Sequence, residues 1–186
     1  DVPPTTRFLV DQYTDSDEVS DGHRKIFFDI EVEVTDGFPD VMKANNVITS
    51  IALYDFLTEK YYTYVFDAKK RLQSYTKDNK IVEVYDTEYE MLNKFFQKYL
   101  EIKPTILSGW NSDYFDIPYL YNRAVNVLGV SVANLLSPIS QVFYNEFKKR
   151  YVIAGVSCLD YLSLYRKFSF SQQSSYRLDY IGEVEV

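Results

Sequence analysis

The sequence contains little of what builds disulfide frameworks, histidine-rich metal centres or membrane-spanning segments. Among its 186 residues there is one cysteine, Cys158, and one histidine, His23. A single cysteine excludes an internal disulfide framework and fits a reducing cytoplasm. A single histidine excludes any site that needs two imidazoles. Because the chain has no run of about 18 apolar residues and no signal-peptide pattern, we expect a cytoplasmic protein without a membrane span.

Positive charge is also scarce. The 20 basic and 27 acidic side chains give a net charge of −7, so charge alone does not indicate a nucleic-acid binder. Aromatic residues are plentiful, and 18 tyrosines and 13 phenylalanines supply more apolar surface than a disordered chain carries. The length suggests one domain, with or without an arm. Since the chain begins at Asp1 and ends at Val186 without a turn signal, we expect a fragment of a longer protein.

Residues 1–22 differ in composition from the rest of the chain. They contain Pro3-Pro4 followed by several acidic residues, which predicts an arm or linker with at most a short strand around Phe8–Val10. From residue 23 onward the pattern is that of a folded domain, so we assign residues 23–186 to one domain.

The first strong strand pattern covers Arg24 to Val34. Every second residue is apolar, which places these residues on one face of a strand: Ile26, Phe28, Ile30, Val32 and Val34. The opposite face is mostly acidic and carries Phe27, Asp29, Glu31 and Glu33. Two more strands are predicted over 47–54 and 61–66, joined as a hairpin.

Helices alternate with short strands in the second half. Thr87 and Glu90 have the spacing of a capping box, and apolar residues recur behind them with helical period. Further elements are predicted as a helix over 117–128, a hairpin around 141–156 and a helix over 160–167. This order predicts an α/β fold in which a mixed β-sheet is flanked by α-helices.

Asp29 and Glu31 form the first candidate site. Two residues apart on a strand, their side chains share one face with Cβ atoms about 7 Å apart. Two like charges this close in a buried strand favour a divalent cation, and Mg²⁺ and Mn²⁺ prefer carboxylate oxygens. The alternative is that both side chains lie on the solvent side of a half-exposed strand.

Asp116 allows two interpretations. It follows a short strand and begins a helix, so it is placed either to bind a metal at a strand end or to cap the helix. Asp160 has the same ambiguity, and there the cap is favoured.

Two motifs taken together resemble those of a known family. They are Phe28-Asp29-Ile30-Glu31 and Gly109-Trp110-Asn111-Ser112-Asp113-Tyr114-Phe115-Asp116-Ile117-Pro118-Tyr119. In order and spacing they resemble the 3′–5′ exonuclease domain of family B DNA polymerases, closest to the replicative polymerases of T-even-type tailed phages. The resemblance runs from about Lys25 to the C-terminus and includes 36–39, 42–44 and 159–170.

The resemblance implies a ribonuclease-H-like fold and a proofreading exonuclease. Its chemistry would be hydrolysis of the 3′-terminal phosphodiester with two Mg²⁺ or Mn²⁺ ions about 4 Å apart. Asp29 would bridge both ions, Glu31 would bind one ion and contact the attacking water, and Asp116 would hold the other ion.

Contacts with DNA are also implied by the resemblance. The residues concerned are Phe38, Asn111, Phe115 and Lys167. For Phe38 the alternatives are stacking on the unpaired primer end and folding back onto the core; for Lys167 they are approach to the scissile phosphate and solvation. The implied partners are the 3′ end of single-stranded DNA and a polymerase domain of the same chain. The location would be the host cytoplasm if the protein is phage-encoded.

A third motif of the family, Tyr-x3-Asp, is absent after the second motif. Tyr176-Arg177-Leu178-Asp179 has one spacer residue too few. We therefore expect a domain truncated before this motif and close to inactive as an isolated fragment. The alternatives are a non-catalytic, exonuclease-like scaffold module of a polymerase and another nuclease of the same fold.

Overall fold

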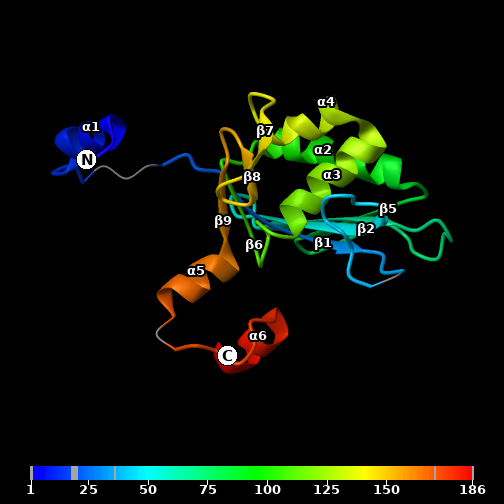
Figure 1. Cartoon of the computed structure of the whole chain (residues 1–186). Coiled ribbons are helices and arrows are strands. Elements are labelled where there is room, and N and C mark those ends of the chain that lie inside the picture. Colours follow the sequence, from blue (N-terminus) through cyan, green and yellow to red (C-terminus); the bar gives the residue numbers. More distant parts are fainter. Residues whose placement is uncertain (1, 18–20, 36, 170, 186) are drawn as a thin grey trace.

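A seven-stranded mixed β-sheet forms the centre of the computed structural model (Figure 1), which describes residues 2–17, 21–35, 37–169 and 171–185. The elements in chain order are α1 (Pro4–Tyr13), β1 (Lys25–Val32), β2 (Ile48–Asp55), β3 (Lys60–Phe66), β4 (Tyr75–Lys77), β5 (Lys80–Tyr85), α2 (Glu88–Ile102), β6 (Ile106–Gly109), α3 (Asp116–Leu128), α4 (Val130–Ala133), the 3₁₀ turn η1 (Asn134–Leu136), β7 (Val142–Asn145), β8 (Arg150–Ile153), β9 (Ser157–Asp160), α5 (Tyr161–Phe168) and α6 (Leu178–Glu185).

The strand order places β1 inside the sheet. The order is β4-β5-β3-β2-β1-β6-β9, with β1 antiparallel to β2 and parallel to β6, and β9 parallel to β6. Parallel strands end at the same edge of a sheet, so the segments that follow β1, β6 and β9 leave from one edge. The predicted mixed sheet flanked by helices is confirmed.

The alternation predicted for β1 is also confirmed. Ile26, Phe28 and Ile30 are buried, whereas the side chains between them are exposed. The strand ends at Val32, earlier than predicted, because its register with β2 shifts between Glu31 and Val32.

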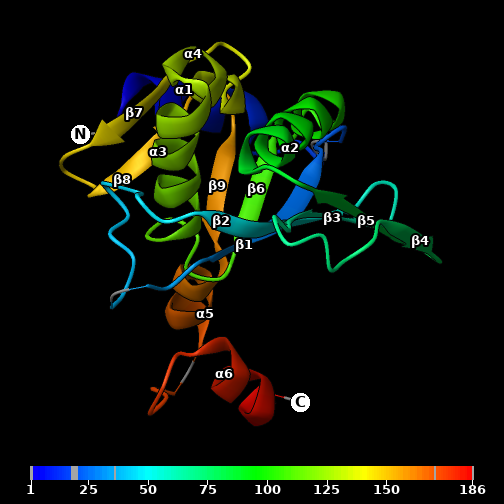
Figure 2. The same ribbon diagram turned by 90° about the vertical axis from the view of Figure 1, so that its right-hand side faces the viewer.

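Helices α2 and α3 cover one face of the sheet, as Figures 1 and 2 show. The predicted capping box begins α2, since the Thr87 side chain accepts a hydrogen bond from the backbone N–H of Glu90 at 3.2 Å. Its apolar side chains pack on the sheet and form the core with β1 and β2: Met91, Leu92, Phe95, Phe96, Tyr99 and Ile102. Leu100, which was grouped with them on sequence, is exposed instead.

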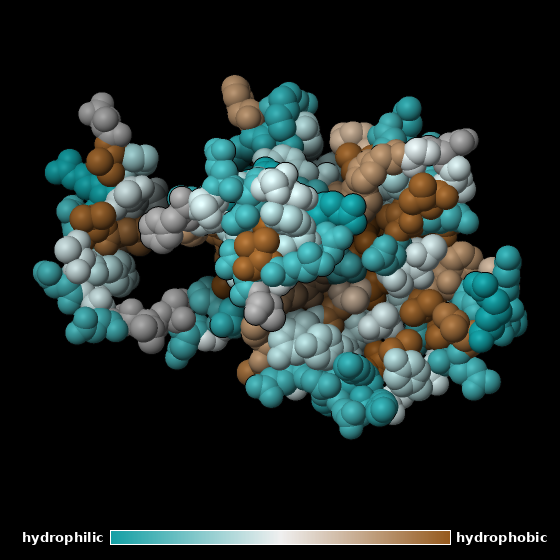
Figure 3. Space-filling model, turned by 90° about the horizontal axis from the view of Figure 1, so that it is seen from below, coloured by the Kyte–Doolittle hydropathy of each residue, from teal (hydrophilic) through white to brown (hydrophobic). Residues whose placement is uncertain are grey.

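The N-terminal segment differs from the prediction. The suggested strand around Phe8–Val10 is wrong, because Pro4–Tyr13 form helix α1, with a proline in the first turn where its missing N–H costs nothing. None of its residues is buried. Figures 1 and 3 show it standing apart from the sheet. Its helical state therefore comes from local backbone bonding.

The opposite face of the sheet is covered less completely. Helices α5 and α6 lie on this side (Figure 1), and apolar side chains remain at the surface seen from there (Figure 3). Phe27, Phe56 and Tyr61 are among the exposed aromatic residues. No helix in the described ranges is both long and apolar enough to cross a membrane.

Candidate active site

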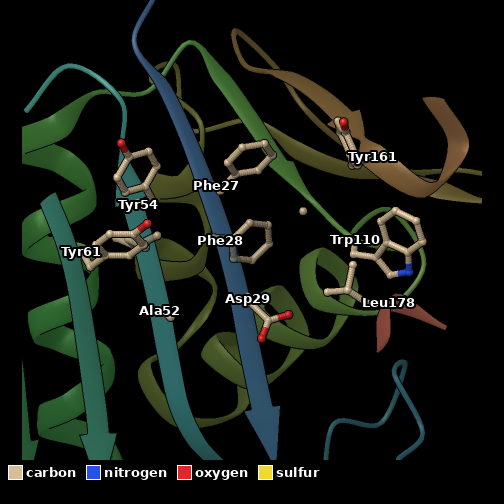
Figure 4. Close-up of a pocket in the computed structure, with 11 residues that line it drawn as sticks. Phe27, Phe28, Asp29, Ala52, Tyr54, Tyr61, Trp110, Tyr161 and Leu178 are labelled. Atoms are coloured by element: carbon tan, nitrogen blue, oxygen red, sulfur yellow. The ribbon is translucent and has the colours of Figure 1, made fainter. Parts of the chain in front are cut away.

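Asp29 lies at a pocket on the exposed face of β1. The pocket has a volume of about 410 Å³, and its walls are mostly aromatic. Figure 4 shows the Asp29 carboxylate leaving β1 toward the side on which Trp110 and Leu178 lie. Glu31, two residues further along, is exposed on the same face. The sequence prediction that the two carboxylates share a face is confirmed.

Asp116 is far from β1 in the sequence, but its side chain bonds to the backbone of this strand. It is the first residue of α3 and only 3% exposed, and its Oδ1 accepts a 3.0 Å hydrogen bond from the backbone N–H of Ile30. Phe115 occupies the N-cap position, and no side chain caps this helix end. The alternative that Asp116 caps α3 is therefore wrong. Its carboxylate instead accepts a hydrogen bond from the backbone of the strand that carries Asp29 and Glu31.

The three carboxylates have little to balance their charge. Burial, and then the charge of Asp29, raises the pKa of Asp116 to about 7. Partial burial and the neighbouring Glu31 raise the pKa of Asp29. Among the described residues none of the three takes part in an ion pair. A divalent cation would remove the cost of ionising them, so the donor set fits Mg²⁺ or Mn²⁺.

The structure does not bring all three together. Within the described ranges, no group of three His, Cys, Asp or Glu side chains is placed to hold one ion. Asp29 and Asp116 are close enough for one charge to act on the other, and Glu31 acts on Asp29. Metal binding by Asp29, Glu31 and Asp116 stays a prediction, with Asp29 and Asp116 as the central pair.

The turn between β6 and α3 positions the predicted DNA-contacting residues. Asn111 has a positive φ of 61°, and its carbonyl accepts hydrogen bonds from the N–H groups of Tyr114 and Phe115. The Phe115 ring lies 5.3 Å, centroid to centroid, from that of Phe38. Phe38 is 82% exposed, so the alternative that it folds back onto the core is wrong. Asp36 of the neighbouring motif lies outside the described residues.

Lys167 is not brought to the carboxylates by any contact in the described part of the chain. It lies in the last turn of α5, and its Nζ is 5.5 Å from the centre of the Phe168 ring. Its approach to the scissile phosphate stays a prediction.

Two other acids, Asp160 and Asp179, already accept hydrogen bonds from the protein. Asp160 caps α5, as favoured on sequence: its Oδ1 accepts from the N–H of Ser163 at 2.8 Å, and its Oδ2 accepts from the N–H of Asp113 at 3.0 Å. Asp179 is exposed and pairs with Arg177, with Nη2 and Oδ2 2.8 Å apart. Within the described ranges neither acid belongs to a group of three placed to hold one ion, although the charge of Asp160 contributes to raising the pKa of Asp116.

Comparison with known proteins agrees with this arrangement. The sequence model of the exonuclease domain of DNA polymerase family B matches residues 6–181. The chain belongs to this family. The DNA-directed DNA polymerase of Escherichia phage RB69 is 36% identical over 209 residues, covering 96% of this chain and 23% of that protein. The corresponding enzyme of Enterobacteria phage T4 is 33% identical over 184 residues, covering 84% and 20%.

The family extends beyond phages. DNA polymerase 1 of Saccharolobus solfataricus is 32% identical over 149 residues, covering 71% of this chain and 17% of that protein. The family B exonuclease domain described here thus spans less than a quarter of the length of these relatives.

Sequence reasoning missed one part of this exonuclease domain. Lys148-Lys149-Arg150 is a compact basic run, a pattern that predicts solvated side chains. Lys149 does pair with exposed Glu146, but Arg150 forms an ion pair with buried Asp113 of the second motif. The two residues are 37 positions apart, and no local pattern links them.

Proposed function

We propose that this chain is the proofreading 3′–5′ exonuclease domain of a family B DNA polymerase. It would hydrolyse the 3′-terminal phosphodiester bond of single-stranded or frayed DNA, working beside a polymerase domain of the same chain in the cytoplasm of the host cell. The observation that carries the proposal is that buried Asp116 accepts a hydrogen bond from the N–H of Ile30 in β1, the strand that carries Asp29 and Glu31.

Asp29, Glu31 and Asp116 are the residues that would hold two Mg²⁺ or Mn²⁺ ions. When bound, such ions activate a water molecule and stabilise the leaving 3′ oxygen. Asp29 would contact both ions, Glu31 one of them and Asp116 the other. The raised pKa values of Asp29 and Asp116 support this assignment, because a nearby cation favours the ionised form of both acids.

The protein's own contribution is to orient these groups. The N–H of Ile30 fixes one oxygen of Asp116 and leaves the other for an ion. Glu31, exposed on the same face as Asp29, would contact the attacking water. Exposed Phe38 and half-buried Phe115 form an aromatic pair on which a terminal base would stack, and Asn111 and Lys167 would contact the strand.

A fourth acid is needed to complete this site. The Tyr-x3-Asp motif that the family resemblance implies does not follow the second motif in this chain, and the related polymerases are several times longer. We place the missing acid in a neighbouring part of the polymerase. The 186-residue chain alone should therefore bind the second ion weakly and be close to inactive. Extension past that motif should raise activity by several orders of magnitude, because grouped catalytic residues fail together.

Calorimetry with Mn²⁺ tests the metal site directly. Asp29→Ala should lose at least one binding event, whereas Glu33→Ala, which removes an exposed acid beyond the end of the same strand, should bind as the wild type does. Equal binding by the wild type and Asp29→Ala would overturn the assignment. An extended chain that folds, binds no Mn²⁺ and leaves single-stranded DNA intact would instead indicate the non-catalytic module.

A further inference from the structure

Asp113 is a buried acid in the turn that leads to Asp116. Its side chain is 3% exposed, and its Oδ2 accepts a hydrogen bond from the Nη1 of Arg150. The other oxygen, Oδ1, is buried and has no hydrogen-bond partner. Its backbone N–H donates to Oδ2 of Asp160 at 3.0 Å. Both the backbone and the side chain of this residue are therefore fixed from outside the turn.

Arg150 brings the β7–β8 hairpin into this arrangement. It is the first residue of β8, and its guanidinium is cationic at any ordinary pH. The hairpin is held to α3 by a second contact, in which the hydroxyl of Tyr151 donates to Oδ1 of Asn122 at 2.8 Å. Three segments meet at Asp113: the second motif, the hairpin and the β9–α5 junction.

Burying the Asp113–Arg150 ion pair costs free energy of folding. Burial raises the pKa of Asp113 despite the Arg150 charge, so the carboxylate is desolvated more than its partner compensates. A neutral pair of similar size would fold here without that cost. Buried ion pairs of this kind are best explained where they fix one arrangement of the chain among several.

We propose that Asp113, held by Arg150 and Asp160, is a positioning residue for Asp116. Elsewhere the turn is held by β6 at Gly109, by Trp110, whose Nε1 donates to the backbone oxygen of Tyr176 at 3.0 Å, and by the bond from Ile30 to Asp116. Fixing Asp113 three residues before Asp116 sets where α3 begins, and with it the direction of the Asp116 carboxylate. The inference rests on the proposed metal-dependent function of that carboxylate.

The test uses Asp113→Asn, which keeps size and removes the charge, and Arg150→Gln, which removes the charge and shortens the side chain. Hydrogen exchange over residues 110–117, measured without metal, should become about 10–100-fold faster in both variants, and Mn²⁺ affinity should fall about 10–100-fold, the range seen when groups that orient a metal ligand are removed. Arg150→Lys keeps a cation at the hairpin, so it should restore part of both properties.

A second buried pair supplies the matched control. Arg24 binds Asp55 through two hydrogen bonds of 3.0 and 2.6 Å at the start of β1, and Asp55 is fully buried. Asp55→Asn should lower the melting temperature as Asp113→Asn does, yet leave Mn²⁺ affinity and exchange over 110–117 within about twofold of the wild type.

Each outcome separates the possibilities. Unchanged exchange over 110–117 in folded Asp113→Asn overturns the positioning role, and if that variant does not fold, the same result in Arg150→Gln overturns it. An equal loss of Mn²⁺ affinity in Asp55→Asn also overturns it, because general destabilisation would then explain the effect. If Asp29→Ala binds Mn²⁺ like the wild type, the proposed function fails instead, and the exchange result still decides whether Asp113 orders the turn.

Discussion

The backbone N–H of Ile30 donates a 3.0 Å hydrogen bond to Oδ1 of Asp116. Residues 86 positions apart in sequence are joined in this way at the strand that carries Asp29 and Glu31. Since an N–H group binds an ionised carboxylate more strongly than a neutral one, this bond opposes the effect of burial on Asp116 without overcoming it.

Asp116→Asn should stabilise the metal-free chain at pH 8. Burial raises the pKa of Asp116 from 3.8 to about 7, so between about pH 4 and 7 the folded chain keeps a proton that the unfolded chain has lost. Stability therefore falls as pH rises through this window. The shift corresponds to about 4 kcal/mol at most, and we expect asparagine to recover about 1–3 kcal/mol at pH 8 and little at pH 4.

Urea unfolding at both pH values, without divalent ions, measures this effect. Glu33→Gln, an exposed acid just past the same strand, serves as the control and should change stability by less than about 0.5 kcal/mol. Addition of Mn²⁺ at pH 8 should stabilise the wild type more than Asp116→Asn. A variant less stable than the wild type at pH 8 would contradict the assigned cost of ionising Asp116.

Phe38→Ala should weaken DNA binding without unfolding the domain. The ring is 82% exposed and contacts Phe115, so its removal should change stability by less than about 1 kcal/mol. Stacking on a base contributes about 1–3 kcal/mol. In an extended chain that contains the fourth acid, this predicts a rise in KM for single-stranded DNA of roughly 5- to 150-fold with a smaller change in kcat. The matched control is Tyr89→Ala, an exposed aromatic residue on α2. An unchanged KM for Phe38→Ala would exclude base stacking.

Gly109→Ala should destabilise the fold and weaken Mn²⁺ binding together. A Cβ at this position would lie 2.6 Å from the backbone oxygen of Phe28, which immediately precedes Asp29. Forcing β6 away from β1 should cost about 1–3 kcal/mol in thermal or urea unfolding. Gly182→Ala in α6, where an added Cβ meets nothing within 4 Å, should be neutral or slightly stabilising. Equal stability of the two variants would show that this close approach is relaxed in solution.

An extended chain containing the fourth acid should prefer frayed ends. A matched duplex terminus must be unpaired and unstacked before it reaches the carboxylates, at a cost of a few kcal/mol by analogy with base extrusion. We expect single-stranded DNA and a 3′-mismatched duplex to be degraded at least about tenfold faster than a matched duplex. The assay uses 5′-labelled strands, so that polarity is read in the same gel. Equal rates, or digestion from the 5′ end, would contradict the proposed function.

The local patterns of this sequence predicted the local structure well. The alternation in β1, the capping box of α2 and the cap of α5 each depend on residues within a few positions of one another, and each is confirmed. Two strands without a fully buried face were missed: β4, whose side chains are all exposed, and β5, whose side chains are mostly half-buried.

The site required information that no local pattern carries. Asp116 has the sequence context of a helix cap, and only the fold shows that its carboxylate reaches the N–H of Ile30. In the same way, Arg150 stands in a basic run that is typical of solvated surface, yet it pairs with buried Asp113. Both relationships depend on how strands and helices far apart in sequence pack together.

The position of β1 in the sheet has a consequence for how the domain folds. Its antiparallel partner, β2, is the next strand in the sequence. Its parallel partner, β6, comes only after α2, and its residue Ile106 pairs with Lys25. Closing that longer loop costs more chain entropy, so we expect the β1–β2–β3 meander to form early and the β1–β6 pairing late. Because Asp116 follows β6, metal affinity during refolding should appear with this last step, and it would report completed folding rather than collapse.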